Sequence, residues 1–181
     1  SKFSVSPFTI QSLLWDALLA LVIMFPVLSN PTRWMIGSSN VDIWNHAWGP
    51  WWWMDSLSKG QWPWATTLLQ YPDGGTLWFI DPVMAIIGTP FAWISPALAY
   101  NMSLWIIIAF ASWSARRFAV ALGAAPSASW IASVTVVCSA WILSELSNGI
   151  TEAVNIGPAA LAMAWTEDAC RKEGMYKLWI K

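Results

Sequence analysis

The sequence predicts an all-α integral membrane protein with about four transmembrane helices and two short juxtamembrane helices in the first outer loop. Of the 181 residues, 57% are hydrophobic and only 10% are charged, whereas an ordinary soluble domain has about 25% charged residues. Apolar runs recur along the chain, and 17 residues are tryptophan. The formal net charge of −1 provides no basic stripe, so no nucleic-acid partner is expected.

Four apolar runs are the predicted membrane spans, within a single membrane domain. Residues 10–29 are enough to cross the roughly 30 Å of bilayer hydrocarbon. The other spans are predicted at 97–122, 127–146 and 150–170, followed by a tail at 171–181. The outer loop covers 30–95. Membrane lipid is therefore the expected surrounding of the chain.

The basic residues predict the orientation. Both termini are expected in the cytoplasm and residues 30–81 outside it, because basic residues favour the cytoplasmic side. Arg116 and Arg117 are interpreted as markers of this topology. Asp16, within the first span, needs either a partner, a wet cleft, or a place near the inner interface. The seven basic residues assigned to the cytoplasmic side are Lys2, Arg116, Arg117, Arg171, Lys172, Lys177 and Lys181.

The outer loop is rich in tryptophan. In "DIWNHAWGPWWW", Trp44, Trp48 and Trp51/Trp52 share one helical face, with Asp42 and His46 off that face. Indole rings favour the headgroup boundary, so this face is expected to anchor a helix in the membrane interface, with a bend or restart at Gly49-Pro50. The nine tryptophans of this segment are Trp34, Trp44, Trp48, Trp51, Trp52, Trp53, Trp62, Trp64 and Trp78.

A turn and a second short helix follow. "YPDGG" is typical of a turn, because Gly74 and Gly75 tolerate positive φ. Only about 13 residues separate Pro82 from Pro96, too few to cross a bilayer. This run therefore predicts an interfacial or re-entrant helix, with Asp81 as its cap and Pro82 at its first position.

These motifs, taken together, resemble a known family. "VDIWNHAW", "LSKGQWPW", "LLQYPDGGTLWFIDP", "SPALAYNMSLW" and "SNGITEAVNIGP" occur in the order found in the N-terminal part of bacterial polytopic glycosyltransferases of the GT-C type. The resemblance implies a protein of the bacterial cytoplasmic membrane, with a polyprenyl-phosphate sugar as donor substrate. Members of that family are longer, so the chain is expected to be an N-terminal part or a shortened relative.

The resemblance implies site residues in the outer loop. An aspartate of the first outer loop is catalytic or metal-associated in the family, and Asp42 matches that place. Asp81, or less favourably Asp73, matches an acidic residue on the second juxtamembrane element, and Glu152 lies in the second outer turn. From its chemistry, Asp42 is the expected base that takes the proton of the acceptor, or else a ligand of a divalent cation, and Glu152, which flanks the second outer turn, is expected to close the site.

Cationic and metal contacts complete the predicted site. Arg33 and Lys59 are the candidate contacts of the lipid phosphate. A divalent cation could be held by Asp42 and His46. Each residue also has a simpler interpretation: Asp42 and Asp81 as helix caps, His46 as a solvated imidazole, and Glu152 as a partner of a helix N-terminus.

Two functions remain open. The first is a membrane glycosyltransferase, or the N-terminal part of one, acting on the extracytoplasmic face. The alternative is a non-catalytic membrane subunit of this fold that binds lipid or docks onto other membrane subunits. Small residues at 127–133 and 157–164 permit close helix packing in either case.

Overall fold

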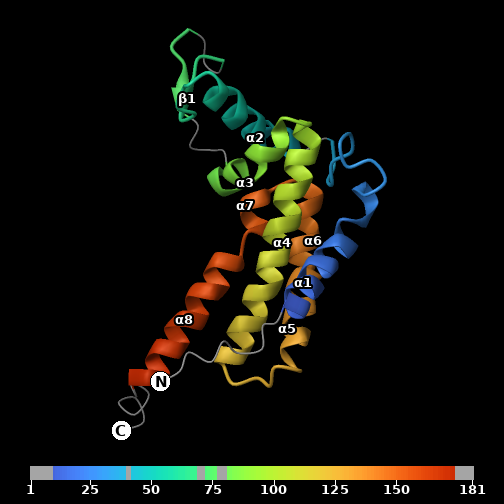
Figure 1. Ribbon diagram of the computed structural model, residues 1–181, viewed down its shortest axis with the longest axis vertical. Helices are drawn as coiled ribbons and strands as arrows, with labels where there is room; N and C mark the ends of the chain where they lie inside the picture. The colour runs from blue at the N-terminus through green and yellow to red at the C-terminus, as the bar shows by residue number, and fades with distance from the viewer. Residues whose placement is uncertain (1–9, 40–41, 69–71, 77–80, 174–181) are drawn as a thin grey trace. The chain divides into compact units, whose positions relative to one another are not determined.

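The computed structural model describes residues 10–39, 42–68, 72–76 and 81–173, and these are mostly helical (Figure 1). Lys2, Trp78, Lys177 and Lys181 lie outside the described residues. The elements in chain order are α1 (Ile10–Ile23), η1 (Phe25–Val27), α2 (Ile43–Ser58), β1 (Ala65–Thr66), β2 (Gly75–Thr76), α3 (Pro82–Ala92), α4 (Pro96–Ala121), α5 (Ser129–Val137), α6 (Ala140–Asn148), α7 (Thr151–Val154) and α8 (Gly157–Glu173).

The chain divides into two compact units. Unit 1 contains the described parts of Ser1–Ile23, Ile106–Leu143 and Asn155–Lys181, and unit 2 those of Met24–Trp105 and Ser144–Val154. Each unit thus combines segments that are distant in the sequence.

Two stretches are long and apolar enough to cross a membrane, judged by length and composition. They are α4, with 26 residues, and residues 129–148, with 20. The second stretch consists of α5 and α6, with Cys138 and Ser139 between them. In the sequence, these stretches nearly coincide with the spans predicted at 97–122 and 127–146.

The other two predicted spans are not continuous helices. The run at 10–29 is α1, which ends at Ile23, followed by the 3-10 turn η1. Pro26 within η1 has no N–H to donate to a helical hydrogen bond, which explains the interruption. The run at 150–170 is divided into α7 and α8, and the chain restarts at Gly157-Pro158. Proline is well tolerated at the first turn of a helix but not in its interior.

In unit 1, α1 has its polar side turned inward. Its buried residues are Ser12, Asp16 and Ala20, spaced by four and therefore on one face. A soluble amphipathic helix has the opposite polarity, with its apolar face toward the core. Figure 1 shows α1 beside α5, which buries Ser129 and Ser133. The exposed apolar residues of α1 are Ile10, Leu13, Leu14, Trp15, Leu18 and Val22, each between 48% and 79% exposed.

The buried carboxylate of α1 has a partner. Asp16 Oδ2 is 2.6 Å from a terminal nitrogen of Arg116, and Asp16 Oδ1 accepts from Arg116 Nε at 3.1 Å. Ser112 also donates to Asp16 Oδ1, and Ser112 and Ser133 share a hydrogen bond. The guanidinium carbon of Arg116 lies 4.0 Å from the centre of the Trp130 ring. Asp16 therefore has a partner within the protein, one of the alternatives expected for it, and Arg116, predicted to mark the topology, is buried in this ion pair.

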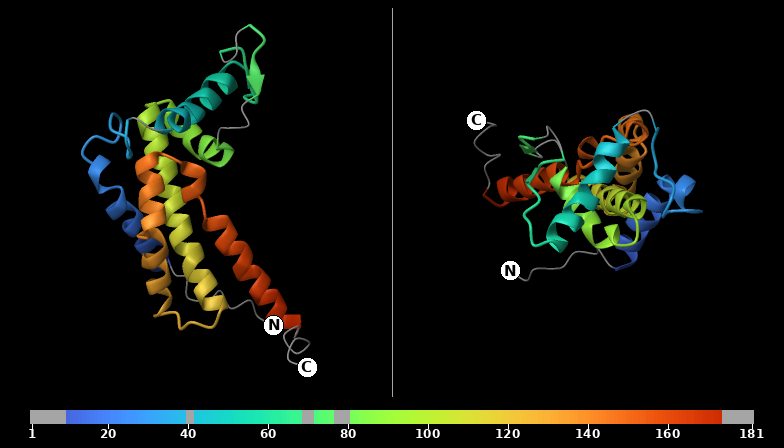
Figure 2. Two further views of the ribbon diagram at one scale, coloured as in Figure 1. Left: turned by 180° about the vertical axis from the view of Figure 1, so that it is seen from behind. Right: turned by 90° about the horizontal axis from the view of Figure 1, so that it is seen from above.

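In unit 2, α2 packs on α3, as both views in Figure 2 show. The two short helices predicted within residues 30–95 are confirmed as helices. α2 continues through Pro50, so of the expected bend or restart the restart is excluded. Gly88 of α3 permits the approach, because a Cβ there would lie 2.8 Å from the Pro50 ring and 2.7 Å from Ser103 Oγ.

The tryptophans of α2 do not form one membrane-facing surface. Trp52 is 8% exposed, packs with Ala85, and donates from Nε1 to the carbonyl of Pro63 at 3.0 Å. Trp48 stacks on Trp52 with ring centroids 5.3 Å apart. Trp44, by contrast, is 59% exposed. Part of the cluster therefore serves as core, which corrects the expectation of a purely interfacial face.

Two very short strands lie on either side of the predicted turn. β1 pairs antiparallel with β2, with Ala65 opposite Thr76 and Thr66 opposite Gly75. Gly74 has φ of +79°, as the turn prediction required. The pairing itself was not predicted, because two-residue strands have no periodicity to detect.

Candidate functional site

Local sequence fixes the first residue of the site. Asp81 precedes Pro82 and is the N-cap of α3, accepting from Val83 N at 2.9 Å and from Met84 N at 3.1 Å through Oδ1. The predicted capping role is confirmed. The second carboxylate oxygen, Oδ2, takes no part in the cap.

A glycine brings α7 against α2. Gly149 has φ of +76°, and a Cβ at this position would lie 2.7 Å from both Cα and N of Ile43. Only glycine permits so close an approach of backbone to backbone. Thr151 and Glu152, at the start of α7, therefore come next to His46, which lies one turn beyond Ile43 on α2.

Four side chains from three helices form the His46 cluster, defined as His46, Asp81, Thr151 and Glu152. Thr151 Oγ1 donates to Asp81 Oδ2 at 3.1 Å and lies 2.9 Å from His46 Nδ1. The other ring nitrogen, His46 Nε2, lies 3.4 Å from Glu152 Oε2. His46 and Asp81 are each 6% exposed and Thr151 is 1% exposed, whereas the Glu152 side chain is 58% exposed. A buried chain of polar groups thus ends at an accessible carboxylate.

The structure brings together three of the predicted site residues: His46, Asp81 and Glu152. Sequence reasoning missed Thr151, which connects two of them. The available signal was its position directly after Gly149-Ile150 and directly before Glu152. The expectation that His46 is a solvated imidazole was wrong, since the ring is buried and bonded to Thr151.

The remaining predicted residues lie apart from these contacts. Asp42 is exposed at the N-cap of α2, its side chain makes no capping hydrogen bond, and its carbonyl accepts from His46 N at 3.3 Å. Lys59 donates to Asp55 at 2.7 Å, and Arg33 is exposed. Within the described ranges, neither cation has a hydrogen bond or ion pair with the His46 cluster.

A metal role for Asp42 and His46 stays a prediction. Among the described residues, no group of three or more His, Cys, Asp or Glu side chains is arranged to hold a metal ion. Both ring nitrogens of His46 already face protein groups, Thr151 and Glu152.

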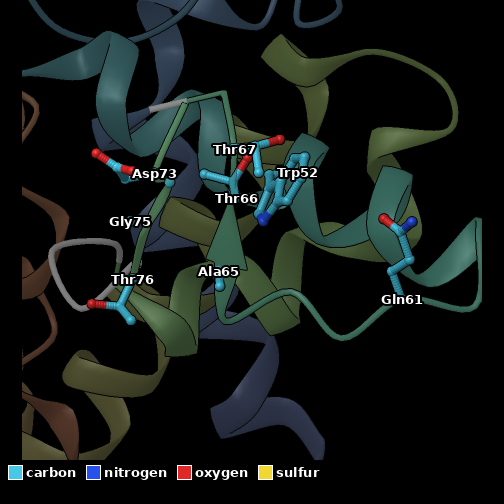
Figure 3. A pocket seen from close by; sticks show the side chains of 9 residues that line it. Trp52, Gln61, Ala65, Thr66, Thr67, Asp73, Gly75 and Thr76 are labelled. Carbon is cyan, nitrogen blue, oxygen red and sulfur yellow. The ribbon is translucent and has the colours of Figure 1, made fainter. Parts of the chain in front are cut away.

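A separate open pocket of about 690 Å³ lies at the hairpin of unit 2. In Figure 3, Asp73 and Gln61 lie at opposite ends of this pocket and their polar atoms do not converge. Trp52, which also lines it, is mostly buried. The pocket offers space but no set of groups aimed at one ligand. Its lining residues are Trp52, Gln61, Ala65, Thr66, Thr67, Asp73, Gly74, Gly75 and Thr76.

Comparison of the chain with protein-family models, with curated proteins and with solved structures found no match.

Proposed function

We propose that the chain is a membrane glycosyltransferase, or the N-terminal part of one, which transfers a sugar from a polyprenyl-phosphate donor on the extracytoplasmic face. The observation that carries the proposal is the His46 cluster. It connects two acids expected at the site, Asp81 and Glu152, through one hydrogen-bonded chain. The accessible end of that chain is a carboxylate, which is the group that an inverting sugar transfer requires.

The membrane location is supported by the polarity of α1. Exposed leucine, valine and tryptophan side chains cover its outer surface, and its serine and aspartate face inward. Such polarity is favourable in lipid, where polar groups must find partners within the protein. We propose four crossings. α1 alone spans about 21 Å at 1.5 Å per residue, so its crossing includes the η1 turn that follows.

The reaction can be written with its atoms balanced. The acceptor hydroxyl oxygen attacks the anomeric carbon of the donor, the bond from that carbon to the phosphate oxygen breaks, and the electron pair leaves with the polyprenyl phosphate. The proton of the acceptor hydroxyl passes to Glu152. General-base catalysis of this kind contributes about 10²–10⁴-fold in rate.

The other residues have supporting roles. Asp81 and Thr151 are buried and act through His46, so they are positioning residues. Asp42, the N-cap residue four positions before His46, is exposed and is proposed as a second carboxylate of the site. Arg33 and Lys59 are proposed contacts of the leaving phosphate. For Lys59 this requires that its hydrogen bond to Asp55 breaks first.

The test is transfer by the full-length protein in carbonate-washed membranes. The probes are polyprenyl-phosphate hexoses labelled in the sugar, and the measurement is loss of label from the lipid. We expect Glu152→Gln to lower the rate by about 100-fold or more. The matched control is Glu167→Gln in unit 1, whose carboxylate binds Arg171, and it should retain full activity.

The outcomes separate the two functions. Unchanged turnover in Glu152→Gln would remove this residue from the mechanism. Binding of the labelled lipid by the wild type without any turnover would favour the non-catalytic subunit instead. Activity that stays in the supernatant after the carbonate wash would contradict the membrane location.

A further inference from the structure

His46 is held by a directional chain of hydrogen bonds. Thr151 carries one hydroxyl hydrogen, and it donates this hydrogen to Asp81 Oδ2. Asp81 Oδ1 already accepts from two backbone N–H groups of α3. The carboxylate is therefore surrounded by donors, and the orientation of the Thr151 hydroxyl is fixed by it.

The direction of this chain decides where the imidazole proton lies. Because the Thr151 hydrogen is used on Asp81, only the Thr151 oxygen lone pair is left for His46 Nδ1, 2.9 Å away. The Nδ1 atom must then carry hydrogen and donate. In a neutral imidazole only one nitrogen carries hydrogen, so Nε2 has a free lone pair.

The free lone pair faces another acceptor. Glu152 Oε2 lies 3.4 Å from His46 Nε2, which is longer than the usual N–H···O distance of about 2.7–3.2 Å. The charged and titratable groups around the ring are Glu152 and Asp81, with Asp42 one turn earlier on the same helix. If Nε2 is unprotonated, its lone pair and the Glu152 carboxylate oxygen are two acceptors that can share one added proton.

We propose that Asp81 and Thr151 hold His46 as the neutral Nδ1–H tautomer, so that Nε2 and Glu152 together accept the proton of the substrate hydroxyl. This inference rests on the proposed function and extends it, because it explains how the base of the same site is kept unprotonated. Thr151 is a positioning residue: it touches no substrate and acts through the ring. After proton transfer, the added hydrogen lies between Nε2 and Glu152, where the two acceptors share it.

The chain contains a single histidine, so the tautomer can be read directly. The full-length protein is produced with ¹⁵N-histidine, purified in detergent micelles, and studied near pH 7.5 by proton-detected long-range ¹H–¹⁵N correlation. Where the full-length protein has further histidines, a sample with His46→Gln identifies the signal of position 46. The wild type should show a protonated Nδ1 and an unprotonated Nε2.

Variants test whether the chain sets this state. Asp81→Asn places an amide N–H opposite Thr151, which reverses the direction of the hydrogen bonds, so we expect the Nε2–H tautomer. Thr151→Val removes the connection and should give a mixture of both tautomers, whereas Thr151→Ser should preserve the wild-type spectrum. Asp55→Asn, on the same helix but bonded to Lys59, is the matched control and should leave the spectrum unchanged.

The spectra test the inference about His46 independently of enzymatic turnover. An Nε2–H tautomer or an imidazolium in the wild type would overturn the inference, as would an unchanged spectrum in a folded Asp81→Asn protein. If the wild type has the expected tautomer but Glu152→Gln retains sugar transfer, the hydrogen-bond chain is correct and the proposed function fails. If the wild type lacks the expected tautomer but Glu152→Gln abolishes sugar transfer, the proposed function stands and Thr151 has no positioning role.

Discussion

Among the described residues, the Asp16–Arg116 pair of unit 1 and the His46 cluster of unit 2 are both buried and polar, and they differ in how they end. In unit 1, the Asp16–Arg116 pair is 1% and 3% exposed, and both carboxylate oxygens accept from Arg116. In unit 2, the His46 cluster ends at Glu152, whose side chain is 58% exposed. A closed, charge-balanced pair has no free group for chemistry, whereas a buried chain that reaches the surface can exchange a proton there. The first cluster therefore holds helices together, and the second is suited to act on a substrate.

Removal of one partner of the closed pair should have the largest effect on stability. Arg116→Met leaves Asp16 as an uncompensated buried charge, which costs about 3–5 kcal/mol. The measurement is thermal unfolding in detergent, followed by tryptophan fluorescence. The double variant Asp16→Leu/Arg116→Met should recover most of the loss, because no charge is then left buried. A single variant as stable as the wild type would show that the pair is not what holds unit 1 together.

Disruption of the approach between α7 and α2 should have an intermediate effect. Gly149→Ala combines a positive φ with a Cβ 2.7 Å from the backbone of Ile43, and we expect a loss of about 1–3 kcal/mol. Sugar transfer should fall as well, because Thr151 and Glu152 move away from His46.

The matched control is Gly60→Ala, which has a similar φ of +69° but open space around the new Cβ. It isolates the backbone strain from the steric clash. Equal losses in the two variants would mean that the contact with Ile43 contributes nothing to the stability of unit 2.

Neutralisation of the exposed end of the second cluster should affect stability least. Glu152→Gln changes a largely exposed side chain that lies 3.4 Å from His46 Nε2, and exposed polar contacts of this kind are worth about 0–1 kcal/mol, so the unfolding midpoint in the same fluorescence assay should hardly move. Combined with the expected loss of turnover, this would separate function from stability within one cluster. A loss of stability comparable to that of Arg116→Met would show that both clusters mainly stabilise the fold.

Features that depend on neighbouring residues could be predicted from the sequence. Asp81 caps α3 because the bonded N–H groups lie two and three residues ahead. The helices of the outer loop follow from their own spacing of apolar residues, and Gly74 adopts the positive φ that its turn requires.

Features that depend on distant residues could not be predicted. Arg116 lies 100 residues from Asp16, and Thr151 lies 105 residues from His46. Nothing in the local pattern distinguishes an arginine that marks topology from one that is buried in an ion pair. Trp52 likewise has the same residue type and helical face as Trp44, yet only Trp52 packs against Ala85.

The sequence by itself determined the helical class, the low charge, the two apolar stretches of sufficient length and the acids within residues 30–95, because composition and periodicity act over a few turns of helix. Only the tertiary structure decided which polar groups are paired and which carboxylate remains accessible. The physical reason is that a buried polar group needs a partner, and the identity of that partner is set by the packing of helices that are far apart in the chain.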